Sequence, residues 1–112
     1  MTHRAPRLPL AHEYHDVSVE KIDLGPRREV VLHVRLDPVW NNGDSSVRRL
    51  HFSAIQNFDE IEAFFAASTV PNTPDAAIDE VIGIVQPQKR VIGLDLARLG
   101  YVEFRGTKLH ER

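Results

Sequence analysis

Two histidines lie where they can bind a ligand if the segments that carry them pair as strands. His33 and His51 both occupy polar positions in stretches of alternating apolar and polar residues, which the loop 38–46 joins. Paired strands place both imidazoles on one face, where Asp16 or Asp37 can add a ligand for a divalent metal. A metal site needs three ligands converging within about 2.0–2.2 Å of the ion, and the spacing guarantees only the shared face. Metal or small-ligand binding through these histidines is therefore our alternative function.

Motifs for other kinds of catalysis do not occur in the sequence. The chain has no cysteine, which excludes a cysteine nucleophile, a thiolate zinc site and a disulfide framework. No serine lies in a G-x-S-x-G motif, and the six glycines are too scattered to form a phosphate-binding loop before a helix. The carboxylates at 59–62 and 79–80 fall where a helix start and a turn explain them, and nothing there implies the burial that a general acid needs. We therefore expect a non-catalytic protein without a cofactor.

The charges are unevenly distributed along the chain. The formal net charge is −2, and basic pairs such as Arg48-Arg49 lie among acidic residues, so we do not expect nucleic-acid binding. Between Leu50 and Gln88 there is no lysine or arginine, and the same stretch holds six carboxylates: Asp59, Glu60, Glu62, Asp75, Asp79 and Glu80. One region of the fold should therefore be acidic and suit a protein partner with a basic surface. Our interface candidates within it are Asp59, Glu62, Asp79 and Glu80.

Trp40 is the fifth interface candidate. It is the only tryptophan, and it lies beside Asn41-Asn42 in a stretch whose Asn42-Gly43 pair is typical of a turn. An exposed aromatic residue on a loop is a common anchor of protein interfaces. The competing interpretation is a lid folded over the open edge of the sheet, and the sequence leaves both open.

The periodicity predicts three strands, one helix and three further strands. The first strand changes its apolar parity near Glu20-Lys21, which indicates a β-bulge. The apolar positions from Ile78 to Val85 fit a helix as well as a strand, but Gly83 costs a helix about 1 kcal/mol, so we favour the strand. The predicted strands are 14–24, 29–37, 47–55, 78–86, 91–96 and 101–105.

The predicted helix spans residues 57–67. Its opening Asn57-Phe-Asp-Glu60 matches a capping box with Asn57 as the N-cap, and Ile61, Phe64 and Phe65 follow at helical spacing. A helix this short must pack its phenylalanine face on the sheet to be stable.

These elements describe one α+β domain, an antiparallel sheet of about six strands with one helix packed on it. We expect the domain to span residues 13–112 and to follow a mobile N-terminal arm, residues 1–12, in which Pro6, Pro9 and a basic bias replace periodicity. The sequence contains neither an apolar run long enough to span a membrane nor the apolar core of a secretory signal. We therefore expect a cytoplasmic protein.

Part of the chain resembles a known kind of protein. Tyr14-His-Asp-Val, then Val19 and Ile22, a hairpin, Leu50-His-Phe and an Asn57-Phe-Asp-Glu-Ile helix form a pattern within residues 14–65. The pattern is similar to small bacterial domains of unknown function and to some immunity-type proteins that open with His-Asp before a β-meander. The resemblance implies no catalytic residues. We expect a homodimeric protein-interaction domain, with an immunity-like role against a basic partner as one form of it.

Overall fold

The computed structural model describes residues 10–25, 27–66 and 77–112. These residues form seven strands and one helix, which lie in the chain in the order β1 Val17–Gly25, β2 Glu29–Arg35, β3 Val47–Ser53, α1 Phe58–Phe65, β4 Asp79–Gln88, β5 Val91–Leu96, β6 Gly100–Arg105 and β7 Lys108–Glu111. Within the described ranges, no helix is long and apolar enough to cross a bilayer.

All seven strands belong to one antiparallel sheet, in the order β6-β5-β4-β1-β2-β3-β7. The α+β prediction, an antiparallel sheet with one helix packed on it, is confirmed. The strand β7 was not predicted, because its four residues are too few to establish an alternating pattern. It pairs with β3 and so extends the sheet by one strand beyond the predicted six.

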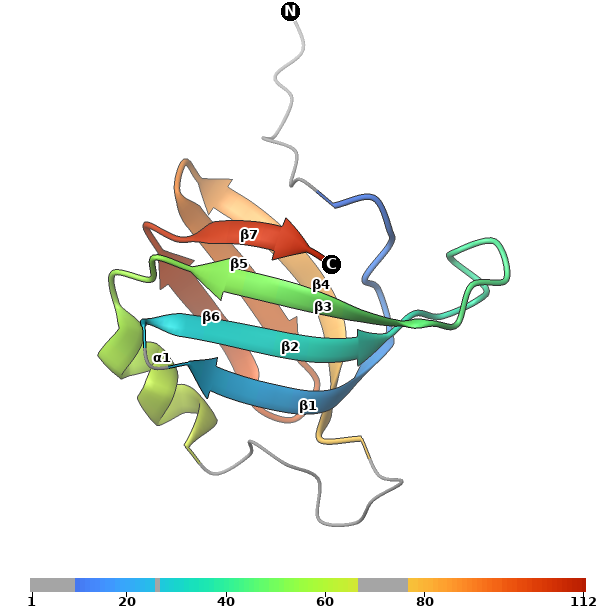
Figure 1. Cartoon of the computed structure of the whole chain (residues 1–112), viewed down its shortest axis with the longest axis horizontal. Coiled ribbons are helices and arrows are strands. Elements are labelled where there is room, and N and C mark those ends of the chain that lie inside the picture. Colours follow the sequence, from blue (N-terminus) through green and yellow to red (C-terminus); the bar gives the residue numbers. More distant parts are fainter. Residues whose placement is uncertain (1–9, 26, 67–76) are drawn as a thin grey trace, which may run out of the picture.

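The sheet is strongly curved. Its two edge strands, β6 and β7, are consecutive in the chain and are joined only by Gly106 and Thr107, so the two edges must approach each other at this corner. Gly106 has a φ of 67°, which favours glycine, and the Thr107 hydroxyl donates to the Ser53 carbonyl at 2.8 Å. Figure 1 accordingly shows β1, β2, β3 and β7 as a front layer, with β4, β5 and β6 behind it.

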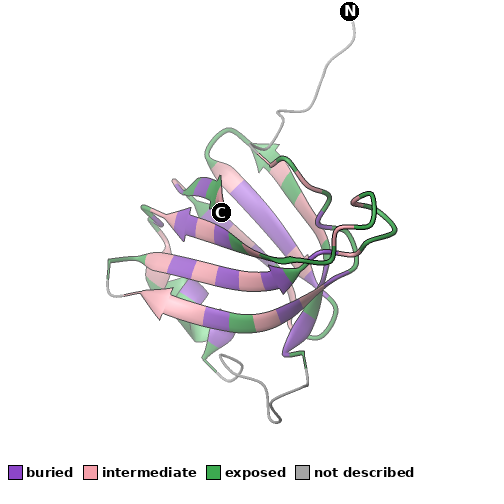
Figure 2. Ribbon diagram, turned by 45° about the vertical axis from the view of Figure 1, so that its right-hand side comes forward, coloured by how far each residue is buried: buried purple, intermediate pink, exposed green. Residues whose placement is uncertain are grey.

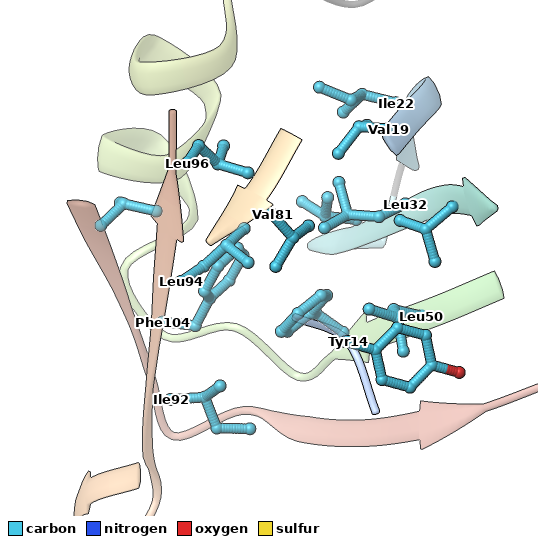
Figure 3. Packing of buried hydrophobic residues seen from close by; sticks show 14 of the residues in the cluster. Tyr14, Val19, Ile22, Leu32, Leu50, Val81, Ile92, Leu94, Leu96 and Phe104 are labelled. Atoms are coloured by element: carbon cyan, nitrogen blue, oxygen red, sulfur yellow. The ribbon is translucent and has the colours of Figure 1, made fainter. Parts of the chain in front are cut away.

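The apolar side chains fill the space between the two layers. Along β2 and β3, buried residues alternate with more exposed ones, as the predicted parity requires (Figure 2). Figure 3 shows Leu32 and Leu50 from one layer facing Leu94 and Phe104 from the other. The Phe104 ring stacks on that of Phe52 with centroids 4.3 Å apart. The core is therefore closed by contacts between the layers.

Two local predictions about the strands are confirmed. The register of β1 against β2 shifts between Val19 and Lys21, where the parity change indicated a bulge. The ambiguous segment 78–86 belongs to a strand, β4. The register of β4 against β5 shifts between Val81 and Gly83. The strand β4 runs on to Gln88, two residues beyond its predicted end, so the turn before β5 is Lys89-Arg90.

The predicted capping box does not form at the start of α1. Asn57 is the N-cap residue and donates to the Glu60 side chain at 3.1 Å, but its side chain makes no capping hydrogen bond to a backbone amide of the helix. Its amide oxygen instead accepts from the Arg105 amide at 2.9 Å, and its amide nitrogen donates to the Glu103 carbonyl at 2.8 Å. These backbone groups belong to the edge strand β6, and they take the Asn57 side chain because no further strand pairs with them.

The predicted N-terminal arm falls partly outside the described residues. Residues 1–9 of the arm are among those that the structure does not describe. Residues 10–12 are described: Leu10 packs against the core, and the amides of Ala11 and His12 donate to Glu111 at 3.1 and 3.3 Å. These contacts hold residues 10–12 against β7.

The aromatic stack makes a prediction about stability. Phe104→Ala removes a fully buried ring that contacts Phe52 and Phe65, and we expect it to lower the free energy of unfolding by about 3–5 kcal/mol. Urea denaturation followed by circular dichroism measures the loss. Val39→Ala, at a position 80% exposed, is the control and should change stability by less than about 0.5 kcal/mol. Equal losses in both variants would contradict the described packing.

Candidate functional site

The two predicted histidines lie on the outer face of the sheet, in a polar groove. His33 is paired across the strands with Arg49, and His51 with Val31. The two imidazoles therefore lie in successive outward-facing rows of the ladder between β2 and β3, with the buried pair Leu32–Leu50 between them. The groove has a volume of about 370 Å³ and is lined by Asp23, Glu29, Val31, His33, Arg49, His51 and Arg112. The predicted shared face is therefore present.

Each histidine of this groove has a carboxylate neighbour. His33 Nε2 lies 2.8 Å from Asp23 Oδ2, within hydrogen-bond distance, and Lys21 Nζ lies 3.5 Å from the other oxygen of Asp23. Burial acts to raise the pKa of Asp23, but the hydrogen bond from His33 and the charge of Lys21 outweigh it and lower that pKa. His51 Nε2 is 3.5 Å from Glu29 Oε2 and makes no hydrogen bond, although this nitrogen is buried. His51 therefore has an unused polar atom.

The third ligand that a metal site needs is not found in the described part of the chain. No group of three histidine and carboxylate side chains there is placed to hold a metal ion. Asp37 lies in the turn after β2, where its carboxylate accepts from the Val39 amide, and Asp16 pairs with His15. Neither lines the groove. The arrangement around His33 and His51 therefore suits a polar organic ligand or an anion better than a metal.

Trp40 is exposed on the loop that joins β2 to β3. Its side chain is 52% exposed, and the neighbouring Val39 is 80% exposed. The Trp40 ring meets the ring of His15 edge to face, with centroids 5.5 Å apart. It is absent from the buried core. Of the two interpretations that the sequence left open, the observed exposure suits an anchor for a partner better than a lid.

The four acidic candidates do not form one surface. Asp59 and Glu62 are exposed on α1, and Glu80 is exposed on β4. Figure 1 shows α1 at the left end of the front strands and the loop 38–46 at their right end, so the helix and Trp40 lie on opposite ends of the molecule. A single partner of ordinary size cannot be centred on both.

Asp79 is the acidic candidate that lies inside the protein. It is 4% exposed, and its carboxylate accepts hydrogen bonds from the amides of Glu80 and Arg98, both at 2.8 Å, and of Leu99 at 2.9 Å. These bonds attach the start of β4 to the turn between β5 and β6. Asp79 therefore organises the backbone and is not available to a partner.

A further polar cluster, which the sequence did not reveal, ties the N-terminal segment to β7. Glu111 accepts from the Tyr14 hydroxyl, and its Oε2 lies 3.0 Å from His12 Nδ1. Asp44 Oδ2 lies 3.8 Å from His12 Nε2 and 3.6 Å from Arg48 Nη2. These residues are far apart in the chain and follow no motif. The four residues of β7 are too few to mark Glu111 as enclosed from the sequence; the structure shows that Leu109 and Glu111 both lie on the inner side of the sheet.

The ionisation of this cluster follows from its hydrogen bonds. Burial acts to raise the pKa of Glu111, but hydrogen bonds from Tyr14, His12 and the Ala11 amide outweigh it and lower that pKa. Burial, together with the bond to Glu111, raises the pKa of Tyr14, which therefore remains a phenol that donates. The cluster has its full set of bonds when Glu111 is ionised.

A pH dependence follows for Glu111. A lowered folded-state pKa contributes stability above the ordinary carboxyl value of 4.5, and this contribution is lost as the pH falls through the folded-state value. We expect Glu111→Gln to lower the free energy of unfolding by about 1–3 kcal/mol at pH 7 and to show a smaller further loss between about pH 5 and pH 3 than the natural protein. Urea unfolding across this range measures both. Glu62→Gln, on the exposed side of α1, is the control. A Glu111→Gln protein with the unchanged acid profile would contradict the assignment.

No protein-family model, no curated protein and no solved structure matches this chain.

Proposed function

We propose that this chain is a protein-interaction domain whose contact surface is the loop 38–46, with Trp40 as its anchor. The observation that carries the proposal is the exposure of Val39 and Trp40 side by side on this loop, with Val47 also exposed where β3 begins. Burying an exposed tryptophan in a partner gives a large gain in binding free energy, and tryptophan is enriched among the residues that dominate interfaces.

The loop is held in one conformation by hydrogen bonds of its own and from outside it. Asn41 is the centre of these contacts: its amide nitrogen donates to the carbonyls of Asp37 and Glu13, and its oxygen accepts from the Glu13 amide. The Arg35 guanidinium donates to the Ser45 carbonyl at 2.9 Å. A surface that is already ordered loses little conformational entropy on binding, which favours affinity.

The carboxylates around Trp40 suggest the charge of the partner. Asp44 belongs to the loop, Asp37 directly precedes it, and Glu13 and Asp16 lie in the segment that contacts it. Glu13 and Asp16 are exposed. An apolar centre with acidic surroundings complements a basic protein surface with a pocket for one aromatic ring. The immunity-like role against a basic partner remains part of this proposal. The contact surface that we propose for it is the loop 38–46 and not the acidic helix α1. A second copy of this chain is the other partner class, and the experiment below distinguishes the two.

Photo-crosslinking at position 40 tests the proposal. We replace Trp40 by a photoreactive phenylalanine analogue in the producing cell and, as a matched control, make the same replacement at Tyr101, which is 50% exposed on β6. We expect a defined adduct from position 40 only. An adduct of twice the chain mass identifies a homodimer, and a different mass identifies a distinct partner, which is then purified.

The purified pair gives the quantitative result. Trp40→Ala should weaken its binding about 30-fold, or about 2 kcal/mol, whereas Tyr101→Ala should leave the affinity unchanged. The Kd should increase with salt if the acidic residues contribute. Calorimetry measures these values, or sedimentation equilibrium if the partner is a second copy. Adducts of equal yield at both positions, or an unchanged Kd in Trp40→Ala, would overturn the proposal.

A further inference from the structure

The outer face of the sheet brings two arginines, Arg49 and Arg112, together in one ladder position. The amide of Arg49 donates to the main-chain oxygen of Arg112 at 2.8 Å, and the amide of Arg112 donates back to the Arg49 carbonyl at 2.9 Å. Residues that exchange both hydrogen bonds lie directly opposite each other and project to the same face, with their Cβ atoms about 5 Å apart. Both side chains line the polar groove. Like charges in this arrangement destabilise a sheet.

Neither guanidinium forms an ion pair with a neighbouring side chain of the described residues. Arg49 is flanked on its other side by His33, its partner in the ladder between β2 and β3. Asp23 is already bonded to His33 and lies near Lys21, and Glu29 lies near His51.

His51 adds a third group, whose Nε2 has Glu29 as a neighbour but makes no hydrogen bond. Its side chain is 17% exposed, and the Nε2 atom is buried. A buried polar atom that lacks a partner is unfavourable unless something outside the chain satisfies it. In the tautomer that carries a proton on this nitrogen, His51 is a third donor in the groove beside the two guanidinium groups. Three donors around one small volume are suited to an oxyanion.

We propose that this groove binds the phosphate group of a small phosphorylated, hydroxylated ligand, such as a sugar phosphate. Arg49, Arg112 and His51 hold the phosphate, because guanidinium groups bind its oxygens in pairs through charge-assisted hydrogen bonds. Bound phosphate also removes the repulsion between the two arginines. The volume of about 370 Å³ lies within the range of sites for small organic molecules.

The two carboxylates of the groove decide between a small ligand and a nucleic-acid strand. Asp23 and Glu29 line the same groove as the arginines. Their charges repel the next phosphates of a polynucleotide, whereas their oxygens accept hydrogen bonds from the hydroxyl groups of a sugar. The face therefore suits one phosphate beside a polar body better than a chain of phosphates.

Binding is tested on the whole chain with four probes: ribose 5-phosphate, inorganic phosphate, ribose and a short single-stranded oligothymidylate. Titrations followed by two-dimensional NMR of the backbone amides locate the site, and the shifts give the Kd. We expect ribose 5-phosphate to bind more tightly than phosphate, ribose alone not to bind, and the shifted amides to belong to β2, β3 and β7. Shifts located elsewhere, or tighter binding of the oligothymidylate than of ribose 5-phosphate, would overturn the proposal.

Two variants and a matched control complete the test. Arg49→Gln and Arg112→Gln should each weaken ribose 5-phosphate binding about tenfold, as the loss of one charge-assisted hydrogen bond predicts. Lys89→Gln removes the same charge from the turn before β5 and should leave the Kd unchanged. A uniform loss in all three variants would indicate attraction by net charge alone and would contradict a built site.

The ligand-free protein gives a second measurement that does not depend on choosing the correct sugar. If the two arginines repel each other, Arg49→Gln should raise the thermal midpoint at low salt, and high salt should reduce the difference. A lowered midpoint would show that no repulsion exists and would overturn the inference. Trp40→Ala should bind ribose 5-phosphate normally, so failure of this proposal and failure of the loop 38–46 as a protein contact are distinguishable.

Discussion

The stack of Phe52 on Phe104 is the contact on which the rest of the structure depends. Phe52 belongs to β3 and Phe104 to β6, and these strands lie near opposite edges of the sheet. A sheet of seven strands twists but does not by itself bring its edges together. The two rings, 4.3 Å apart, and the short connection through Gly106 and Thr107 hold the two layers face to face. The single helix adds Phe65 to the same cluster.

A filled interior determines where ligands can bind. The space between the layers is occupied by buried aliphatic and aromatic side chains, so most polar groups lie on the outer face or at the margins of the sheet. The margin near the N-terminal segment holds Tyr14, Glu111 and His12, whose donors and acceptors are largely matched with one another. The outer face of β1, β2 and β3 differs, because the buried Nε2 of His51 makes no hydrogen bond there and the exposed guanidinium groups of Arg49 and Arg112 belong to no ion pair of the described residues. Matched groups stabilise the fold, and unmatched ones are available to a ligand.

The parts of the fold that follow local rules were predictable from the sequence. Alternation placed Val30, Leu32 and Val34 on the buried face of β2, and the parity change near Glu20 marked the bulge in β1. The shared face of His33 and His51 followed from the same rule. In each of these cases, the side chain's own strand and its immediate neighbour determine the result.

The parts that depend on distant backbone groups were not predictable. The Asn57 side chain bonds two backbone groups of the edge strand β6 instead of capping its helix. Asp79 is buried because its carboxylate accepts from two amides of the distant turn between β5 and β6, those of Arg98 and Leu99, as well as from the amide of the adjacent Glu80. Sequence patterns describe side chains and their neighbours along the chain, but not which remote amides lack a partner. The pairing of Arg49 with Arg112 was missed for the same reason, since it exists only because β7 joins the sheet beside β3.

The two proposed surfaces share one hairpin but no side chain. The strands β2 and β3 line the groove along their outer face, and the loop 38–46 that carries Trp40 connects their ends. The ladder between the strands is continuous from Val30 to Arg35, which makes the hairpin a rigid support for both. Phosphate binding neutralises charges that already face the groove and requires no movement of that ladder. A partner on the loop contacts residues that are already ordered by Asn41 and Arg35. The structure therefore predicts that the two binding events contribute independently to the free energy, as sites without shared contacts usually do.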